Sequence, residues 1–391
     1  MYKRQASYTT AEPVEAVLAR AGKVLGRRRF RVVTDDGSVS AERGYLREAG
    51  NLLFHISVLV VLAGFAMGSL FGFKGGVIVV TGDSFSNTLS QYDDFAPGRA
   101  FGPDDLAPFS FKVDSFDVTF IRKGRSAGSA TKFFADLDVQ PAPTSAPRRQ
   151  RISVNHPLTI DGTKVFLIGH GYAPHITVRD GKGNVAYSGA TVFLPENEAF
   201  TSFGVVKAPD AEPKQIGLSG EFYPTYAFTN VTGPFSAFPD ARNPAISMLA
   251  YSGDLGLDTG EAQSVYALDM KGLKPVRKAD GKPVRIDLAL GKSQTLPDGL
   301  GTVTFDGVSR FVRLQVSESP GSKIALAGMV LALTGLLASL FIRPRRIWVR
   351  ARREGDRTIV EVAGLDRSSG GDLTGELDQI LGALEPEESR T

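Results

Sequence analysis

The sequence lacks cysteine entirely, since none occurs among its 391 residues. This absence excludes disulfides, thiolate metal sites, cysteine nucleophiles and thioether attachment of a prosthetic group by the chain itself. Net charge is also scarce, because 45 Lys and Arg residues oppose 42 Asp and Glu residues. No zinc-finger, phosphate-loop or hydrolase motif occurs. We therefore expect no nucleic acid as a partner, and no thiol or hydrolytic catalysis.

Charged residues are missing from two long stretches. The stretch GNLLFHISVLVVLAGFAMGSLFGF, residues 50–73, runs for 24 residues without a formal charge. A second stretch, Ile324–Ile342, has 19 uncharged residues between Lys323 and Arg343. A helix needs about 20 residues to cross a hydrocarbon core of about 30 Å. Both stretches therefore predict transmembrane helices in a lipid membrane.

Basic residues outside the two stretches predict an orientation. Ten Lys and Arg residues precede Asn51, and seven more lie in residues 343–357. The residues between the two stretches carry 26 Lys and Arg against 26 Asp and Glu. Basic residues accumulate on the cytoplasmic side of membrane proteins. We therefore expect a multi-pass protein of the cytoplasmic membrane, with both termini cytoplasmic and the large middle region outside.

The middle region has the pattern of β-strands. The segments FSFKVDSFDVTFI, PVRIDLAL and GTVTFDGV alternate with period two, and Asp180-Gly181 and Asp280-Gly281 are hairpin signals. The predicted fold class is a membrane protein with transmembrane α-helices and a large, mainly antiparallel β extracytoplasmic domain, as a sandwich or open barrel. The predicted boundaries are a cytoplasmic segment at 1–49, a helix at 50–73, the β domain at 74–322, a helix at 323–342, and a cytoplasmic basic flank with an acidic tail at 343–391.

Histidine is rare, with four residues in the chain, and one of them, His55, lies in the first apolar stretch. It falls about one helical turn inside the predicted cytoplasmic end. An imidazole at this depth can simply face the lipid headgroups. Alternatively, it is a metal or cofactor ligand in a helix bundle, because imidazole is a usual axial ligand of haem iron. The residue alone leaves both interpretations open.

The other three histidines, His156, His170 and His175, lie within twenty residues of one another. Their contexts, H-P, H-G-Y and P-H-I, resemble turns and lack a recognisable ligand spacing. We expect solvated or structural histidines here, with a metal site as the alternative. No residue of the chain is predicted to be catalytic.

Three groups of residues carry a resemblance to a known family. They are Phe54-His55-Ile56-Ser57 near the start of the first helix, NHPL at 155–158 with Gly162 and Gly169–Tyr172 beyond it, and Gln315-Val316 with Pro320-Gly321 directly before the second helix. In this combination, from about Ala6 to Arg353, the chain resembles the ResB family of cytochrome c biogenesis proteins. ResB-like proteins usually have two further N-terminal spans, so the resemblance implies a truncated gene model and four spans in the complete protein.

The resemblance implies a function in the system II pathway of cytochrome c maturation. There a ResB-like subunit and a ResC-like (CcsA-like) membrane subunit carry haem outward and support its covalent attachment to apocytochrome c. His55 matches the family's haem-ligand histidine, so it is the expected ligand of transiently bound haem. The β domain would dock the partner, apocytochrome c or a thiol-reducing thioredoxin-like protein. The chain would be part of a haem lyase complex and no enzyme on its own.

Two other classes of function remain open. A membrane scaffold would bind extracytoplasmic proteins through its β domain without contacting haem, and it would tolerate replacement of His55. An extracytoplasmic enzyme would bring acids or a metal together among the three outer histidines. Replacing those histidines would then abolish function while the membrane helix tolerated change.

Overall fold

The computed structural model describes residues 2–260, 263–366 and 373–385. The chain forms two compact units, of which one comprises Met1–Met67 with Gly321–Thr391 and the other Gly68–Pro320. The first unit contains a small α/β domain and two long helices. The second unit is a β domain. The registers between the named strands are antiparallel in both, as the alternation predicts.

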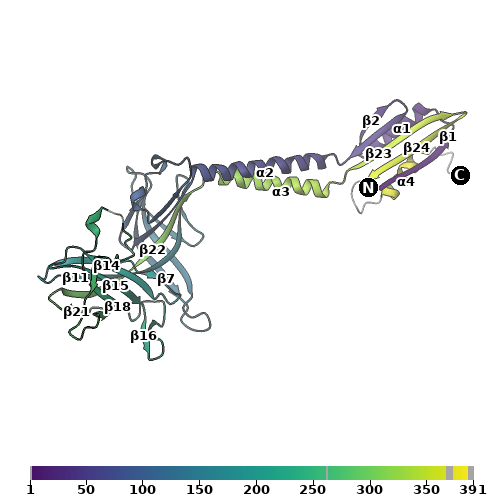
Figure 1. The fold of residues 1–391 in the computed structure, drawn as a ribbon. Helices are drawn as coiled ribbons and strands as arrows, with labels where there is room; N and C mark the ends of the chain where they lie inside the picture. The colour runs from purple at the N-terminus through teal and green to yellow at the C-terminus, as the bar shows by residue number, and fades with distance from the viewer. Residues whose placement is uncertain (1, 261–262, 367–372, 386–391) are drawn as a thin grey trace. The chain divides into compact units, whose positions relative to one another are not determined.

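The small domain joins segments from both ends of the sequence. Its sheet has the order β1-β24-β23-β3-β2 (Figure 1). The strands are β1 (Tyr2–Thr10), β2 (Arg31–Asp35), β3 (Ser38–Arg43), β23 (Arg345–Glu354) and β24 (Arg357–Asp366), and the helices are α1 (Val14–Arg27) and α4 (Leu373–Leu384). The predicted cytoplasmic segment at 1–49 and the predicted flank at 343–391 thus contribute to one domain. Residues 367–372 and 386–391 of that flank lie outside the described residues.

Helical periodicity explains why α1 and α4 pack on one face of this sheet. The buried residues are Val17, Leu18, Ala21 and Leu25 in α1 and Leu373, Leu377, Ile380 and Leu384 in α4. They recur three or four positions apart, so each helix presents one apolar stripe. Both stripes contact the inward strand residues, among them Val39, Val349 and Val360. The side chains of Arg345 and Arg43 pair with Glu376 at the start of α4, and Arg345 also donates to Asp366 at 3.1 Å.

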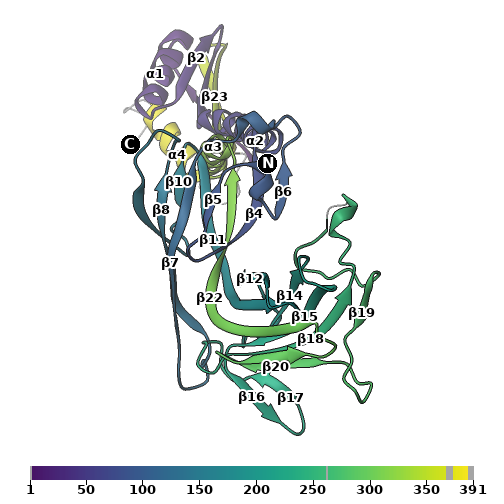
Figure 2. The ribbon, with the colours of Figure 1, turned by 90° about the vertical axis from the view of Figure 1, so that its left-hand side faces the viewer.

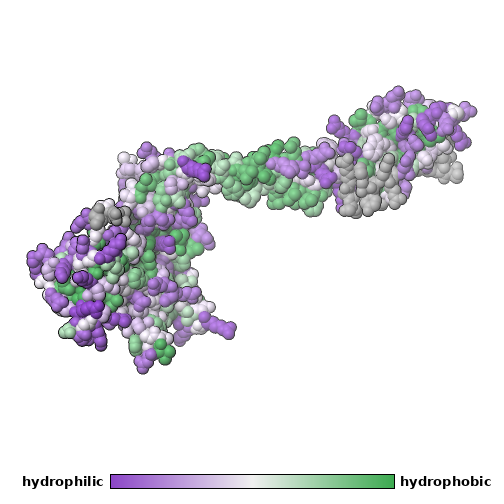
Figure 3. All heavy atoms as spheres, viewed as in Figure 1, coloured by the Kyte–Doolittle hydropathy of each residue, from purple (hydrophilic) through white to green (hydrophobic). Residues whose placement is uncertain are grey.

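The first unit also contains most of the long helix α2 (Leu46–Phe71), whose residues after Met67 belong to the second unit, and the long helix α3 (Ser322–Phe341). Their lengths, 26 and 20 residues, correspond to about 39 and 30 Å at 1.5 Å per residue. Both are long and apolar enough to cross a membrane, and only 11% and 17% of their most apolar windows are buried. Most of the helix-pair surface visible in Figure 3 is hydrophobic. This exposure differs from the buried core helix of a soluble protein.

Small residues let α2 and α3 pack in close antiparallel contact. The buried residues are Gly50, Ser57 and Gly64 on α2 and Ala325, Gly328 and Gly335 on α3. A Cβ atom at Gly335 would lie 2.6 Å from the backbone N of Phe54. The spacing is seven residues throughout on α2 and three and then seven residues on α3, which keeps the small residues on one seam, as in left-handed helix pairs. We call this contact the glycine seam.

The β domain consists of two lobes that share two long strands. The shared strands are β11 (Thr163–Arg179) and β22 (Gly301–Glu318), and they pair from Lys164 to Arg179 with two register shifts. Figure 2 shows both strands curving from one lobe into the other. Register shifts of this kind bend a strand. One pair of strands therefore contributes to two separate hydrophobic cores.

The first lobe packs the β10-β11-β22-β4-β6 sheet against a four-stranded sheet, β5-β7-β8-β9. Its other strands are β4 (Phe73–Val80), β5 (Ser84–Ser86), β6 (Asp94–Pro97), β7 (Ser110–Phe120), β8 (Ala130–Gln140), β9 (Arg148–Ser153) and β10 (Leu158–Ile160), with short 3₁₀ helices at Leu89–Gln91 and Pro103–Asp105. The predicted helix at 50–73 ends earlier, at Phe71, because Phe73 already pairs with Glu318. Gly72 makes this exit possible, since a Cβ there would meet the carbonyl oxygens of Glu318 and Gly68.

The second lobe packs the far halves of β11 and β22 against the β13-β14-β15-β18-β19 sheet. Its strands are β12 (Val185–Ala190), β13 (Leu194–Pro195), β14 (Ser202–Ala208), β15 (Gln215–Tyr223), β16 (Tyr226–Thr229), β17 (Gly233–Ser236), β18 (Ala245–Gly253), β19 (Leu273–Pro275), β20 (Arg285–Ala289) and β21 (Ser293–Leu296), with a 3₁₀ helix at Leu257–Thr259. Sheets packed face to face correspond to the sandwich alternative of the predicted fold.

Candidate functional site

His55 is the tenth residue of α2 and lies on the face opposite the glycine seam. Each helical residue turns by about 100°, so His55 is about 200° away from the buried Ser57. Its side chain is exposed. Among the residues that the structure describes, neither ring nitrogen has a hydrogen-bond partner; the nearest ring is that of Phe54, with centroids 5.3 Å apart. The imidazole therefore faces away from α3.

The surroundings of His55 change from polar to apolar along the same face of α2. Glu48 and Asn51 precede it by seven and four residues, and Leu59 and Leu62 follow it by four and seven residues. The two leucines are 65% and 58% exposed. This spacing puts all five side chains within about 80° of one another. His55 thus lies at the boundary between a polar helix end and an uncovered apolar face.

A hollow of about 280 Å³ adjoins the polar end of this face, lined by Arg47, Glu48, Asn51 and Ser339. The Nε of Arg47 donates to the carbonyl oxygen of Ser339 at 3.2 Å, which connects α2 to the end of α3. Asn51 is one helical turn, about 6 Å, from His55. The hollow therefore places a guanidinium, an amide and a carboxylate beside the candidate ligand.

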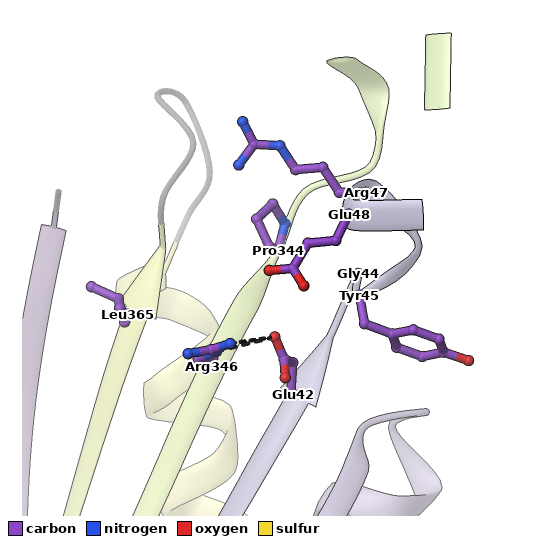
Figure 4. A pocket seen from close by; sticks show the side chains of 8 residues that line it. All are labelled: Glu42, Gly44, Tyr45, Arg47, Glu48, Pro344, Arg346 and Leu365. Carbon is purple, nitrogen blue, oxygen red and sulfur yellow. Dashed lines mark hydrogen bonds and ion pairs between the residues drawn. The ribbon is translucent and has the colours of Figure 1, made fainter. Parts of the chain in front are cut away.

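A second, narrow hollow of about 30 Å³ lies where the helix pair joins the small domain (Figure 4). It is lined by Glu42, Gly44, Tyr45, Arg47, Glu48, Pro344, Arg346 and Leu365. Arg346 donates to Glu42 at 3.0 Å. Gly44 has φ of 81° and passes against the backbone of Arg343, so the two linkers cross closely and only glycine fits there.

The three histidines of the β domain do not form a common site. His156 is exposed in the turn between β9 and β10, with Nδ1 3.1 Å from the carbonyl oxygen of Val154. His175 lies on β11 with Nε2 2.7 Å from Oγ of Ser309. Within the described residues, no three His, Asp or Glu side chains are grouped as metal ligands would be. The structure therefore gives no support to the alternative of an outer metal site.

His170, also on β11, occupies an aromatic cluster that sequence reasoning missed. Its ring lies 4.8 Å from that of Phe200, stacked at 15°, and 4.9 Å from that of Phe116. Phe120 and Phe133 complete the cluster. Burial, assisted by the positive charge of Arg310, lowers the pKa of His170 to about 4. The imidazole is therefore neutral near pH 7, which fits a structural part of the lobe junction.

Phe200 holds an unusual backbone conformation beside His170. Its φ is 57°, a region that bulky side chains rarely adopt. The carboxamide oxygen of Asn197 accepts hydrogen bonds from the amides of Ala199 and Thr201, each at 3.1 Å, and fixes this turn. The turn presents the Phe200 ring to the imidazole. No local sequence pattern predicts the cluster, because its rings come from positions far apart in the sequence.

Comparison with known proteins identifies relatives over nearly the whole chain. The sequence model of the ResB-like family matches residues 1–378. The "Cytochrome c biogenesis protein CcsB" of Microcystis aeruginosa is 23% identical over 336 residues, which cover 85% of this chain and 61% of the relative. The protein of the same name from Synechococcus elongatus is 23% identical over 83% of this chain and 58% of the relative. The protein of the same name from Gloeobacter violaceus is 28% identical over 35% of this chain and 27% of the relative. The chain thus spans at most about 60% of the length of these relatives.

Proposed function

The chain belongs to the ResB-like family, and from this premise we propose that it is a membrane subunit of a cytochrome c maturation system. It carries haem across the cytoplasmic membrane and supports haem attachment to apocytochrome c, together with a ResC-like membrane subunit. The three relatives described above are each named a cytochrome c biogenesis protein, and this supports the role. The haem is cargo, bound in transit.

Both ends of the chain lie in the cytoplasm, and the β domain lies outside. The excess of Lys and Arg before Asn51 and after Ile342 supports this orientation. The small domain supports one part of it, namely that both ends lie on the same side, because β3 and β23 pair directly although α2, the β domain and α3 separate them in the sequence. Paired strands must lie on one side of any membrane that α2 and α3 cross. The chain between β3 and β23 must then cross that membrane an even number of times, and one crossing each by α2 and α3 meets this requirement.

His55 is the haem ligand that this chain supplies, and its geometry carries the proposal. An imidazole in lipid without a hydrogen-bond partner is costly. His55 has none within the described residues and faces away from α3. A ligand that is not among the described residues, a lipid headgroup or water can satisfy it. A haem iron at Nε2 does so, while the porphyrin lies against exposed Leu59 and Leu62.

The rest of the chemistry belongs to other subunits. The chain has no cysteine, so it cannot itself reduce the apocytochrome thiols by thiol-disulfide exchange. A histidine of the ResC-like subunit supplies the second axial ligand. The β domain docks that subunit, apocytochrome c or a thiol-reducing thioredoxin-like protein on its outer surfaces. This chain then contributes binding and positioning.

The test is the absorption spectrum of the chain purified together with its ResC-like partner. The wild-type complex should show a reduced low-spin haem spectrum, and His55→Ala should lose it, with recovery on addition of imidazole. His156→Ala is the matched control, because that histidine is exposed in the β domain and should leave the spectrum unchanged. Identical spectra for wild type and His55→Ala would instead support the scaffold alternative and place His55 among the headgroups.

A further inference from the structure

The open face of the small-domain sheet carries two ordered rows of side chains. Its other face is covered by α1 and α4. The strand registers align Arg31, Glu42, Arg346 and Leu365 in one row, and Val33, Ser40, Trp348 and Ala363 in the next. Successive rows on one face are about 7 Å apart along the strands. A charged row therefore lies directly beside an apolar row that contains the single tryptophan of the sequence.

These two rows surround an open hollow of about 260 Å³, lined by Arg31, Val33, Ser40, Ala41, Glu42, Arg346 and Trp348. Trp348 is half-buried, and its neighbours across both adjacent strands, Ser40 and Ala363, are small. Small neighbours leave part of the indole uncovered. The hollow thus offers an aromatic surface that is open to solvent, and its volume is slightly below that of enclosed ligand pockets, which begins near 300 Å³.

The charge of the hollow favours an anionic ligand. Arg346 pairs with Glu42 at 3.0 Å, which neutralises one guanidinium. Arg31 is exposed and has no ion-pair partner within the described part of the chain. Arg31 and Arg346 are two strands apart, about 10 Å. A flat apolar molecule with carboxylates at one edge fits this arrangement, because the indole stacks on its face and guanidinium groups bind carboxylates.

The hollow also leads toward His55. It shares Glu42 and Arg346 with the narrow hollow of Figure 4. That hollow in turn shares Arg47 and Glu48 with the hollow at Asn51, one turn before His55. The narrow hollow, about 30 Å³, is too small for a porphyrin. A bound porphyrin would therefore move along the exposed side of the linker at Tyr45, which is 52% exposed.

We propose that the hollow at Trp348 is the site where haem first docks from the cytoplasm, with its ring against the indole and a propionate carboxylate on Arg31. This inference rests on the proposed function and adds a receiving site upstream of His55. Haem joins a flat apolar ring to two carboxylates, the two features that the indole of Trp348 and the guanidinium of Arg31 would bind. Anionic lipid headgroups share the negative charge and are the competing occupant.

The single tryptophan makes the site directly measurable. Its emission in the full 391-residue chain, reconstituted alone in zwitterionic nanodiscs, comes from a side chain of this hollow, and the His55→Ala background removes quenching by haem held at the membrane ligand. Haem should quench the emission saturably in wild type and also in His55→Ala, which lacks the membrane ligand. In the His55→Ala background, Arg31→Glu should raise the apparent Kd at least tenfold. Arg353→Glu, an equal charge change at the far end of β23, should leave it within twofold.

Three outcomes would overturn the inference. Quenching that disappears in His55→Ala would mean that only the membrane site binds haem. Equal affinities of the Arg31→Glu and Arg353→Glu chains would mean unspecific partitioning of haem into the disc. The third outcome is that phosphatidylglycerol changes the emission and that Arg31→Glu weakens this change while leaving the haem affinity unaltered. That result would assign the hollow to anionic lipid. The spectrum of the partner complex tests His55 separately, so either hypothesis can fail alone.

Discussion

The His170 cluster predicts a specific pH dependence of stability. Burial and the charge of Arg310 lower the pKa of the imidazole to about 4, against 6.5 for the unperturbed group. Between these two values the unfolded chain binds a proton that the folded chain does not. Stability therefore falls as the pH decreases from 6.5 toward 4, and the contribution of His170 is fully present above pH 6.5.

The structure sets the size of this effect. One pKa unit corresponds to about 1.4 kcal/mol, so lowering the pH from 7 to 4.5 removes about 2.4 kcal/mol for a fully shielded group. The ring is only half-buried, and solvent screening reduces the effect to about 2 kcal/mol. For a domain of this size, that difference corresponds to a Tm change of about 4–8 °C.

The assay compares wild type with His170→Phe, which keeps a flat ring against Phe200 and removes the titrating group. The Tm of each purified chain is measured by circular dichroism at pH 7.0 and pH 4.5. Wild type should lose about 4–8 °C more than His170→Phe over this interval. His156→Phe, at an exposed histidine, should behave like wild type. Parallel pH profiles of wild type and His170→Phe would refute the assigned pKa and its cause.

Two further predictions concern the first unit. Gly335→Ala should destabilise the helix pair by a net 1–2 kcal/mol in SDS titrations followed by circular dichroism, because its Cβ would meet the backbone of Phe54 and overpacking costs about 1–3 kcal/mol. Gly68→Ala, where a Cβ meets nothing within 4 Å, should stabilise α2 by up to about 1 kcal/mol, and equal effects of both changes would contradict the glycine seam. Leu377→Ala, at a side chain only 3% exposed, should cost the small domain about 2–5 kcal/mol. Hydrogen exchange should then accelerate in α1 as well as in α4, whereas protection that persists in α1 would mean that the two chain ends fold separately.

The sequence predicted those elements whose signal is local. The two helices follow from uncharged runs, and the strands β7, β20 and β22 follow from alternation, since each pattern is readable within its own segment. The start of α2 at Leu46 was missed because Arg47 and Glu48 are charged, although the helix continues through them. Composition marks the apolar part of a helix and not its polar first turn.

Elements that depend on distant pairing could not be predicted. The apolar stripes of α1 and α4 are visible in the sequence, but nothing in either stripe says that β23 and β24 provide the surface they share. His55 could be chosen as a candidate from the sequence because a polar residue in an apolar run is conspicuous. The aromatic surroundings of His170 could not be predicted, because Phe116 and Phe200 approach it only after β7, β11 and the turn at Asn197 have assembled.

The strand order of the small domain has a consequence for biosynthesis. β24 and β23 separate β1 from the β2–β3 hairpin, so these two parts of the sheet cannot be joined until the C-terminal hairpin exists. Between Arg43 and Arg345 the ribosome must add 301 residues. At about 5–20 residues per second, this takes about 15–60 s. During that interval the apolar stripe of α1 lacks the residues of β23 and β24 that pack against it in the folded domain.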